Sequence, residues 1–281
     1  MRALRRLRRR WSRLLGRRTA RAAPPRVYAI DVKDRPREDW QRMIAENPAE
    51  AARWMYGAAT AGYVDAQLSW AQMQLDGLGT PRDPQGAFRW FEIAAQSKRV
   101  DAVNLLGRCH ELGWGTPVDA GKAAECYRAA ADDGLDWAQY NLGLMLLEGR
   151  GVACDPDEAF VLFLRAAEAG HVKSFHMVGQ FLEHGVGRPR DPARARDWYR
   201  RAAEAGERRG AYHYGLLLIE CGEERHGLAW LARAADGAPD WFVREKESEL
   251  AAHPLAAVRA IAAAMAGVSV AAPAAGTDVR L

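Results

Sequence analysis

Cysteine and histidine side chains can bind metal ions, and a cysteine thiolate can act as a nucleophile. The four cysteines are Cys109, Cys126, Cys154 and Cys221. No two of them have the C-x-x-C spacing of a zinc or redox site. His171, His176 and His184 lie close together, but spacings of five and eight residues do not place them on one helical face. No cysteine or acid completes a ligand set, so the sequence predicts no metal site.

A Gly-x-Gly pattern recurs along the chain, and glycine-rich loops can cradle phosphate groups. The pairs are Gly77 and Gly79, Gly113 and Gly115, Gly149 and Gly151, and Gly185 and Gly187. A phosphate-binding loop follows a strand and carries a Lys-Ser/Thr pair or a third glycine. These pairs follow predicted helices instead, and we interpret them as turns. No Ser/His/Asp or Cys/His arrangement stands out either, so the sequence predicts no bound cofactor and no enzymatic activity.

These turns belong to a unit of 36 residues that repeats along most of the chain. One column of the repeat reads Asn47, Asp83, Asp119, Asp155 and Asp191. Proline follows this column in four of its five rows. An Asx side chain accepts a hydrogen bond from the first turn of a helix, and proline suits the first helical position. Each Asx residue is therefore predicted to start a helix.

Apolar residues follow each start at helical spacing, and glycine ends the helix. In the first unit this apolar face is Ala51, Trp54, Met55, Ala58 and Ala59. The terminating glycines are Gly62, Gly134, Gly170 and Gly206. Lys98 takes this place in the second unit, so a different turn is expected there. The tryptophans of one internal column, Trp54, Trp90, Trp198 and Trp230, are interpreted as core residues.

A second helix follows in each unit and carries small residues in register. Their column reads Ala71, Gly107, Gly143, Gly179 and Gly215. A glycine inside a helix costs about 1 kcal/mol relative to alanine, so its recurrence indicates that neighbouring helices approach closely. No segment of the repeats alternates with the period of two that a half-buried strand requires. The repeats are therefore predicted to be entirely α-helical.

The spacing of these columns resembles the Sel-one-like repeat, a family of tetratricopeptide-like solenoids. The residues that carry the resemblance are Leu142, Gly143, Gly149, Gly151, Val152, Asp155, Ala159, Ala166, Ala167 and Gly170. It covers residues 47–237 and implies an all-α fold, a right-handed α/α solenoid of about five to six 36-residue two-helix repeats with capping helices. Near the end of this range Cys221, Gly222 and Glu223 replace the Gly-x-Gly pattern.

The ends of the chain differ from the repeats. Residues 37–46 are predicted to form an N-terminal capping helix and residues 238–266 to form C-terminal capping helices. Such caps are expected because an end unit must shield an apolar face that has no neighbour. We interpret residues 27–36 as a linker and residues 267–281 as a disordered tail.

Residues 1–26 form an Arg-rich segment with eleven arginines and no acidic residue. The whole chain has 40 basic and 36 acidic residues, so the remainder has 29 basic against 36 acidic residues, a net charge of −7. The predicted electrostatic anchor is Arg5, Arg6, Arg8, Arg9, Arg10 and Arg13 with Trp11. Four interpretations stay open: a basic amphipathic helix on an anionic membrane surface or a partner, contact with nucleic acid, a targeting segment, and an extension without a function or a start codon placed too far upstream.

The resemblance also indicates whether the cysteines form disulfides. The secreted branch of the family pairs a cysteine in the Ala-Ala column with one early in the next helix, and this chain has neither cysteine. We therefore expect free thiols and a cytoplasmic protein. The alternatives are a disulfide between Cys109 and Cys126, and peripheral membrane attachment or targeting through residues 1–26.

The resemblance implies that the helix carrying the Leu-Gly pair lines a concave face. Its inward-pointing positions outside the core lie three residues before and one residue after the column glycine, and they vary in kind from unit to unit. The predicted partner-binding residues are Asn104, Arg108, Trp137, Tyr140, His176, Gln180 and Tyr212. The alternative is that these are ordinary solvated positions. Trp137 stands in an otherwise polar column, so it is either a local packing feature or a contact residue.

Aromatic and arginine anchors dominate protein interfaces. The sequence therefore predicts a monomeric, non-catalytic scaffold or adaptor that binds a protein partner along its concave face. The alternative is a protein that acts on a membrane surface or on nucleic acid through its Arg-rich segment.

Overall fold

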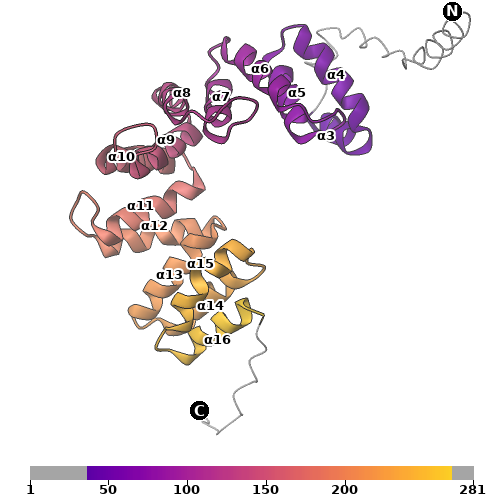
Figure 1. Ribbon diagram of the computed structural model, residues 1–281. Helices are drawn as coiled ribbons and strands as arrows, with labels where there is room; N and C mark the ends of the chain where they lie inside the picture. The colour runs from indigo at the N-terminus through magenta and orange to yellow at the C-terminus, as the bar shows by residue number, and fades with distance from the viewer. Residues whose placement is uncertain (1–36, 268–281) are drawn as a thin grey trace, which may run out of the picture. The chain divides into compact units, whose positions relative to one another are not determined.

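Asx residues cap four helices of the computed structural model, which describes residues 37–267 (Figure 1). Asp83 Oδ1 accepts a hydrogen bond from the backbone N–H of Gly86 at 2.8 Å. Asn47, Asp155 and Asp191 cap their helices in the same way, and proline occupies the first turn of all four helices. The helix starts predicted at these positions are confirmed.

The helices fall into two compact units, which meet in sequence between Asp119 and Ala120 and are described separately. The first unit contains α3 (Arg37–Glu46), α4 (Pro48–Thr60), α5 (Val64–Asp76), α6 (Pro84–Ala95) and α7 (Val100–Leu112). The second contains α8 (Ala120–Asp132), α9 (Asp136–Glu148), α10 (Pro156–Glu168), α11 (Val172–His184), α12 (Pro192–Glu204), α13 (Arg208–Glu220), α14 (Glu224–Ala235), α15 (Asp240–Ala251) and α16 (Ala256–Met265).

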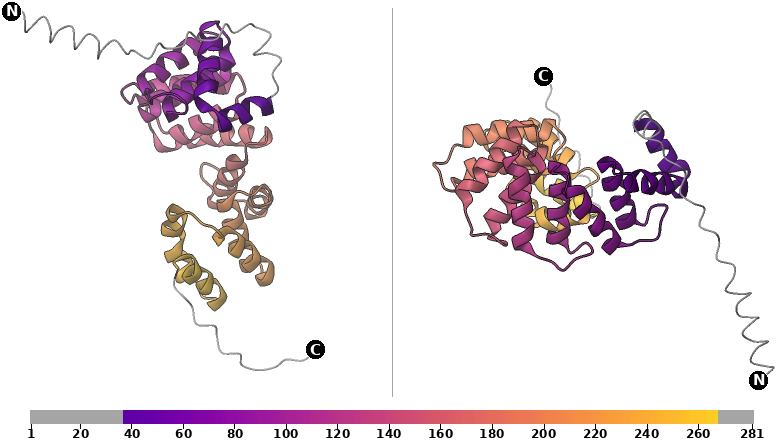
Figure 2. Two further views of the ribbon diagram at one scale, coloured as in Figure 1. Left: turned by 90° about the vertical axis from the view of Figure 1, so that its right-hand side faces the viewer. Right: turned by 90° about the horizontal axis from the view of Figure 1, so that it is seen from above.

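Helices that follow one another in the chain pack in pairs within each unit, as the views of Figures 1 and 2 show. Residues 37–267 contain no strand. The predicted all-α solenoid is therefore confirmed. We call α4, α6, α8, α10 and α12 the Asx helices, because each follows a residue of the Asx column. We call α5, α7, α9, α11 and α13 the glycine helices, because they carry the column of small residues.

The alanine columns form the tightest part of the core. The alanines four residues after the Asx column, Ala51, Ala87, Ala123, Ala159 and Ala195, are all 0% exposed. The tryptophans that we expected in the core, Trp54, Trp90, Trp198 and Trp230, are only half-buried. The residue after each tryptophan is the buried one, as Phe91 and Tyr199 illustrate. Successive helical residues point about 100° apart, so the tryptophan lies at the margin of the core.

The glycine column permits the close approach that the sequence indicates. A Cβ atom added at Gly143 would lie 2.8 Å from the ring of Phe163, and one added at Gly179 would lie 2.6 Å from the ring of Tyr199. Both rings belong to the Asx helix that follows. Each glycine therefore makes room for the aromatic side chain of the next repeat.

The Gly-x-Gly segments are turns, as predicted, and their two glycines serve different purposes. Gly149 ends α9 with a left-handed backbone at φ 66°. Gly151 has φ 70°, and a Cβ atom there would lie 2.3 Å from the backbone carbonyl group of Ala120. The second glycine thus lets the turn lie directly on the start of the Asx helix α8.

Lys98 shares the left-handed backbone of the glycines in its column, but the hydrogen bonds of the turn differ, as expected. The Ser97 hydroxyl donates to the carbonyl oxygen of Ala94 at 2.6 Å, whereas the N–H of Leu135 donates to the corresponding oxygen of Ala130 in the third unit.

The φ of Lys98 is +59°, and its backbone N–H donates to the carbonyl oxygen of Ala95 at 2.9 Å. The N–H of Gly134 donates to Ala131 in the same way at 3.0 Å. The packing of the repeat imposes this left-handed backbone, and the exposed lysine adopts it although the conformation suits glycine.

Replacing this lysine by glycine is therefore expected to stabilise the first unit. The Lys98→Gly variant should gain about 1 kcal/mol in free energy of unfolding, because glycine has no Cβ to strain in the left-handed region. Urea unfolding followed by tryptophan fluorescence measures the change. Lys98→Ala is the control, since it keeps the strain and should gain nothing; equal gains for both variants would contradict this explanation.

Helices outside the repeats cover both ends of the described residues. Met43 and Ile44 of α3 pack against the core formed by α4 and α5. At the other end Phe242, Leu250 and Val258 of α15 and α16 are buried in a core shared with α13 and α14. The predicted Arg-rich segment 1–26 and linker 27–36 lie outside the described residues, as does the predicted tail apart from residue 267.

Candidate partner-binding surface

The predicted partner-binding residues of the first unit are engaged within their own fold. Asn104 is buried, and the guanidinium group of Arg108 lies 4.7 Å from the centre of the Trp114 ring. At the start of the glycine helices, Arg99 forms ion pairs with both Asp65 and Asp101 at 2.5 Å. These ion pairs hold the pKa of Arg99 above its usual value. Asp65 and Asp101, which stand 36 residues apart in the repeat, are therefore both paired with Arg99 in the first unit.

In the second unit two predicted contact residues are buried. Tyr212 is 1% exposed, with Phe242 packed edge-on against its ring at 6.0 Å and Lys246 over its face at 4.9 Å. His176 is 4% exposed and contacts His213 at 5.1 Å between ring centres. The following helices cover these side chains, so neither Tyr212 nor His176 presents the accessible surface that partner binding requires.

Trp137 is a surface residue, which distinguishes it from the two buried positions. Its side chain is 49% exposed, although α9 is otherwise well packed. Its ring stands edge-on to the ring of His171 at 4.5 Å, and Tyr140 contacts the same histidine at 4.7 Å. Tyr140 and Gln180 are half-buried. Of the residues predicted in this unit, Trp137, Tyr140 and Gln180 thus reach the surface.

Two cationic residues occupy the same column as Trp137 on the next two glycine helices. The amino group of Lys173 on α11 lies 5.6 Å from the centre of the Trp137 ring. The guanidinium group of Arg209 on α13 lies 4.9 Å from the ring of Trp241, which is 48% exposed on α15. We call Trp137, Lys173, Arg209 and Trp241 the Trp137–Trp241 strip.

Sequence reasoning missed three members of this strip. Trp137, Lys173 and Arg209 stand 36 residues apart, so the repeat itself was the signal that places them in one column. Trp241 lies beyond the repeats, and no column of the sequence connects it to the strip. Only its contact with Arg209 does so.

Buried polar groups beneath the strip fix its shape. His171 precedes α11, and its Nδ1 and the Ser174 hydroxyl are 2.8 Å apart. Burial lowers the pKa of this imidazole, so a neutral ring supports Trp137. Glu207 turns inward and accepts hydrogen bonds from the backbone N–H groups of Arg209 and Gly210 at the start of α13. Burial raises the pKa of this carboxyl group.

The two cations of the strip differ in the ion pairs that they form within the described residues. Arg209 Nη2 bonds to Glu245 at 2.8 Å, and this ion pair helps to lower the pKa of Glu245 against the opposing effect of burial. Lys173 is exposed and has no ion-pair partner among the described residues. The strip therefore combines two half-exposed indole rings with one unpaired and one singly paired cation.

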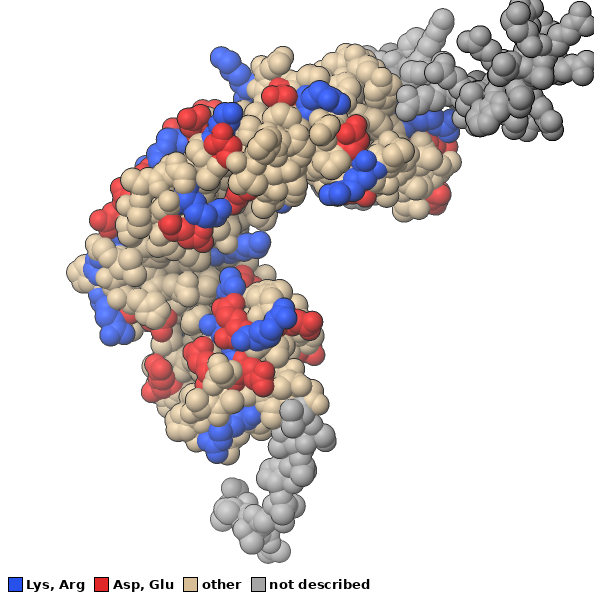
Figure 3. All heavy atoms as spheres, in the orientation of Figure 1, with Lys and Arg blue, Asp and Glu red and all other residues tan. Residues whose placement is uncertain are grey.

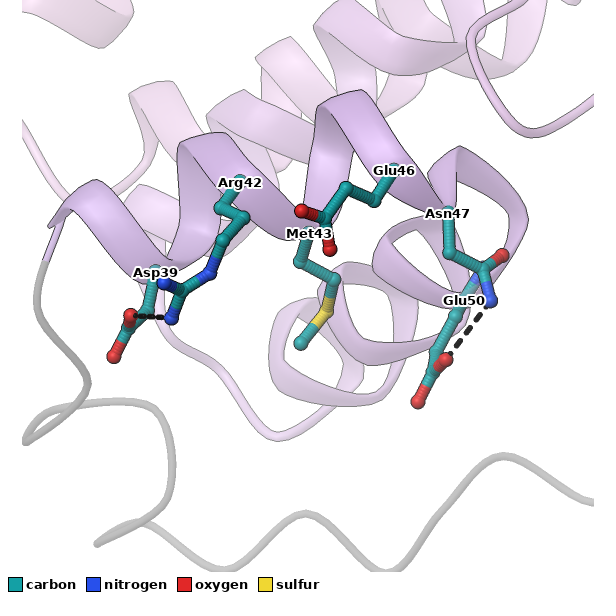
Figure 4. Close-up of a pocket in the computed structure, with 6 residues that line it drawn as sticks. All are labelled: Asp39, Arg42, Met43, Glu46, Asn47 and Glu50. Atoms are coloured by element: carbon teal, nitrogen blue, oxygen red, sulfur yellow. Dashed lines mark hydrogen bonds and ion pairs between the residues drawn. The ribbon is translucent and has the colours of Figure 1, made fainter.

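A hollow lies beside α3 and α4 in the first unit (Figure 4). Its volume is about 420 Å³, and its lining is Asp39, Arg42, Met43, Glu46, Asn47 and Glu50. Asp39 forms an ion pair with Arg42, and Asn47 Nδ2 donates to Glu50 at 3.0 Å. No group of three or more metal-ligating side chains forms anywhere in residues 37–267. The hollow thus offers polar side chains already bonded to one another.

Other features of the described residues give little indication of a site. None of the four cysteines is part of a disulfide, so the alternative Cys109–Cys126 disulfide is not formed. Lysine and arginine side chains are interspersed with aspartate and glutamate on the face seen in Figure 3. None of the helices α3 to α16 is long and apolar enough to cross a membrane.

Comparison with known proteins agrees with this architecture. The family model for the Sel1 repeat matches residues 41–63, 64–98, 100–135, 138–171, 176–207 and 210–238. A Sel1 repeat protein from Oxalobacter formigenes is similar over 83% of this chain and 99% of its own, with 23% identity and a TM-score of 0.70.

A protective antigen of uropathogenic Escherichia coli that displays an SLR fold is also similar. It is 25% identical over 84% of this chain, with a TM-score of 0.65. The similarity spans about half of that protein, 53% of its length. A search of curated proteins found no match.

Proposed function

Because this chain belongs to the Sel1 repeat family, we propose that it is a non-catalytic scaffold or adaptor that binds a protein partner through the Trp137–Trp241 strip. Solenoids of stacked repeats present extended surfaces suited to protein partners. The observation that carries the proposal is the half-exposed indole of Trp137, held in place by the buried ring of His171. A large aromatic side chain on a rigid support is the usual anchor of a protein interface.

The neighbours of Trp137 favour this position over the others predicted from the sequence. Tyr140 and Gln180 lie half-buried on α9 and α11 and extend the contact area beside the strip. Tyr212 and His176 are assigned to the core. Exchanging Tyr212 for alanine would therefore test folding rather than binding, because it leaves a cavity against Phe242.

Removing the Trp137 side chain is expected to weaken partner binding strongly. Affinity capture with the full-length chain from the lysate of its native host, followed by mass spectrometry, identifies the partner. The Trp137→Ala variant should then bind this partner about 30-fold more weakly, as loss of an interface anchor worth about 2 kcal/mol requires. Isothermal titration calorimetry measures the difference.

Val161→Ala is the matched control for this experiment. Val161 is 44% exposed but lies on the Asx helix α10 rather than on a glycine helix. Its truncation also removes an exposed apolar side chain, so it should leave the affinity unchanged. A partner that binds the Trp137→Ala variant as tightly as the unaltered chain would refute the proposed site.

A further inference from the structure

We infer that the segment recognised by the Trp137–Trp241 strip is acidic in its middle and apolar on both sides. This inference rests on the proposed function and adds the chemistry of the partner to it. Two indole rings, each about half exposed, stand at the two ends of the strip. The two cations, Lys173 and Arg209, lie between the indole rings in the order of the helices that carry them.

The hydrogen-bond donors of the strip are suited to bind a carboxylate of the partner. Lys173 carries three N–H donors and no ion-pair partner among the described residues. Arg209 carries five donors on its side chain, and the bond from Nη2 to Glu245 is the one that its guanidinium group makes within residues 37–267. Charge-assisted bonds from ammonium and guanidinium groups to carboxylates are about twice as strong as neutral ones.

Two carboxylates of the chain near these cations, Glu207 and Glu245, are already engaged. Glu207 points inward and caps α13 through two backbone N–H groups. Glu245 is shared between Arg209 and Lys246, at 2.8 and 3.4 Å. Neither carboxylate pairs with Lys173, so an outside acidic group has an unoccupied partner there.

The contacts within the strip set the order of the recognised segment. The amino group of Lys173 lies 5.6 Å from the centre of the Trp137 ring, and the guanidinium group of Arg209 lies 4.9 Å from the centre of the Trp241 ring. Each indole therefore lies beside one cation. The expected pattern is an apolar residue beside an acidic residue at each of these two pairs, with the acidic residues on the inner side.

Selection from a random peptide library displayed on phage tests this inference on the full-length chain. The immobilised chain is compared with its Lys173→Glu variant, which keeps residues 1–26 and their eleven arginines. Acidic peptides that bind those arginines are selected on both chains. Only peptides that bind the unaltered chain and not the variant are therefore ligands of the strip. A glutamate near the N-terminus of α11 interacts favourably with the helix dipole. This variant is therefore expected to fold.

Peptides specific for the unaltered chain should be enriched in aspartate and glutamate flanked by leucine or aromatic residues. Their affinity should fall about tenfold or more on Lys173→Glu, which corresponds to about 1.4 kcal/mol. Lys122→Glu on the Asx helix α8 is the charge-matched control and should change nothing. Specific peptides that are neutral or basic, or that tolerate Lys173→Glu, would overturn the inference.

The same library separates the two proposals through the Trp137→Ala variant. Peptides that require Trp137 but ignore Lys173 would leave the scaffold function standing and refute the acidic segment. If no selected peptide depends on either Trp137 or Lys173, the strip is not a binding surface for peptide segments. The inferred acidic segment would then be refuted, while the scaffold function is tested separately by the affinity of the captured partner for the Trp137→Ala variant.

Discussion

Lowering the pH from 7 to 5 is expected to reduce the free energy of unfolding by about 2 kcal/mol for each of two enclosed histidines, His176 and His213. His213 stacks on Tyr199 at 5.0 Å and contacts His176 at 5.1 Å. Burial lowers the pKa of His176 to about 2 and that of His213 to about 3, and the nearby charges of Arg209 and Lys246 act in the same direction.

The direction of the effect follows from the folded and unfolded pKa values. The folded protein keeps both rings neutral, whereas an unfolded histidine takes up a proton near pH 6.5. The stability that neutral rings provide is therefore fully present above pH 6.5 and is lost as the pH falls toward 3. Glu245 opposes the shift at His213 but does not outweigh burial.

Urea unfolding at pH 7 and pH 5 measures this loss. His213→Phe is the informative variant, because a phenyl ring can keep the stacking contact with Tyr199 but cannot take up a proton. Between pH 7 and pH 5, the free energy of unfolding of this variant should fall by about 2 kcal/mol less than that of the unaltered chain. Equal losses in the two proteins would show that His213 does not titrate as the structure requires.

The second large effect is expected at Gly151. The Gly151→Ala variant should lose about 3 kcal/mol in free energy of unfolding. Part of the loss is the left-handed backbone at φ 70°, which costs an L-residue about 1–2 kcal/mol. The remainder arises because the new methyl group would lie 2.3 Å from the backbone of Ala120, which can yield only by moving the helix α8.

Gly134→Ala separates these two contributions. Gly134 also has a left-handed backbone, at φ 89°, but a Cβ atom there would meet nothing within 4 Å. This variant should lose only the backbone term of about 1–2 kcal/mol. Thermal or urea unfolding of both variants checks the ordering, and equal losses would contradict the close contact between the turn and α8.

The sequence predicted the elements of this fold because their signals are local. An Asx residue followed by proline, apolar residues at helical spacing and a terminating glycine each act within one helix. Asp83 and Asp155 cap the helices that they were expected to start. The repetition of these signals at one period then predicted the solenoid.

The failures arose where packing between helices decides the outcome. Lys98 lacks the glycine signal, yet its backbone is left-handed at φ +59°, because the flanking helices require that conformation. Tyr212 and His176 occupy positions expected to face a partner, but helices that follow in the chain cover them. A column pattern specifies which face of a helix a residue occupies, and it does not specify how far the next helix extends over that face.

The sequence predicted only part of the candidate site, because contacts between helices also define it. Trp137 stood out because a tryptophan in a polar column is unusual. Lys173 and Arg209 are ordinary residues for such a column, and they gain meaning only through their contacts with Trp137 and Trp241. A single sequence does not reveal that two cations lie between two exposed indoles.

Hydrogen–deuterium exchange of the full-length chain, with and without its captured partner, tests the proposed site most directly. Partner binding is expected to slow exchange at the first turns of α9, α11 and α13 and at α15, which carry the strip. The Asx helices α8, α10 and α12 should exchange at the same rate in both states. Protection confined to the Asx helices, or to residues 1–36, would contradict the account.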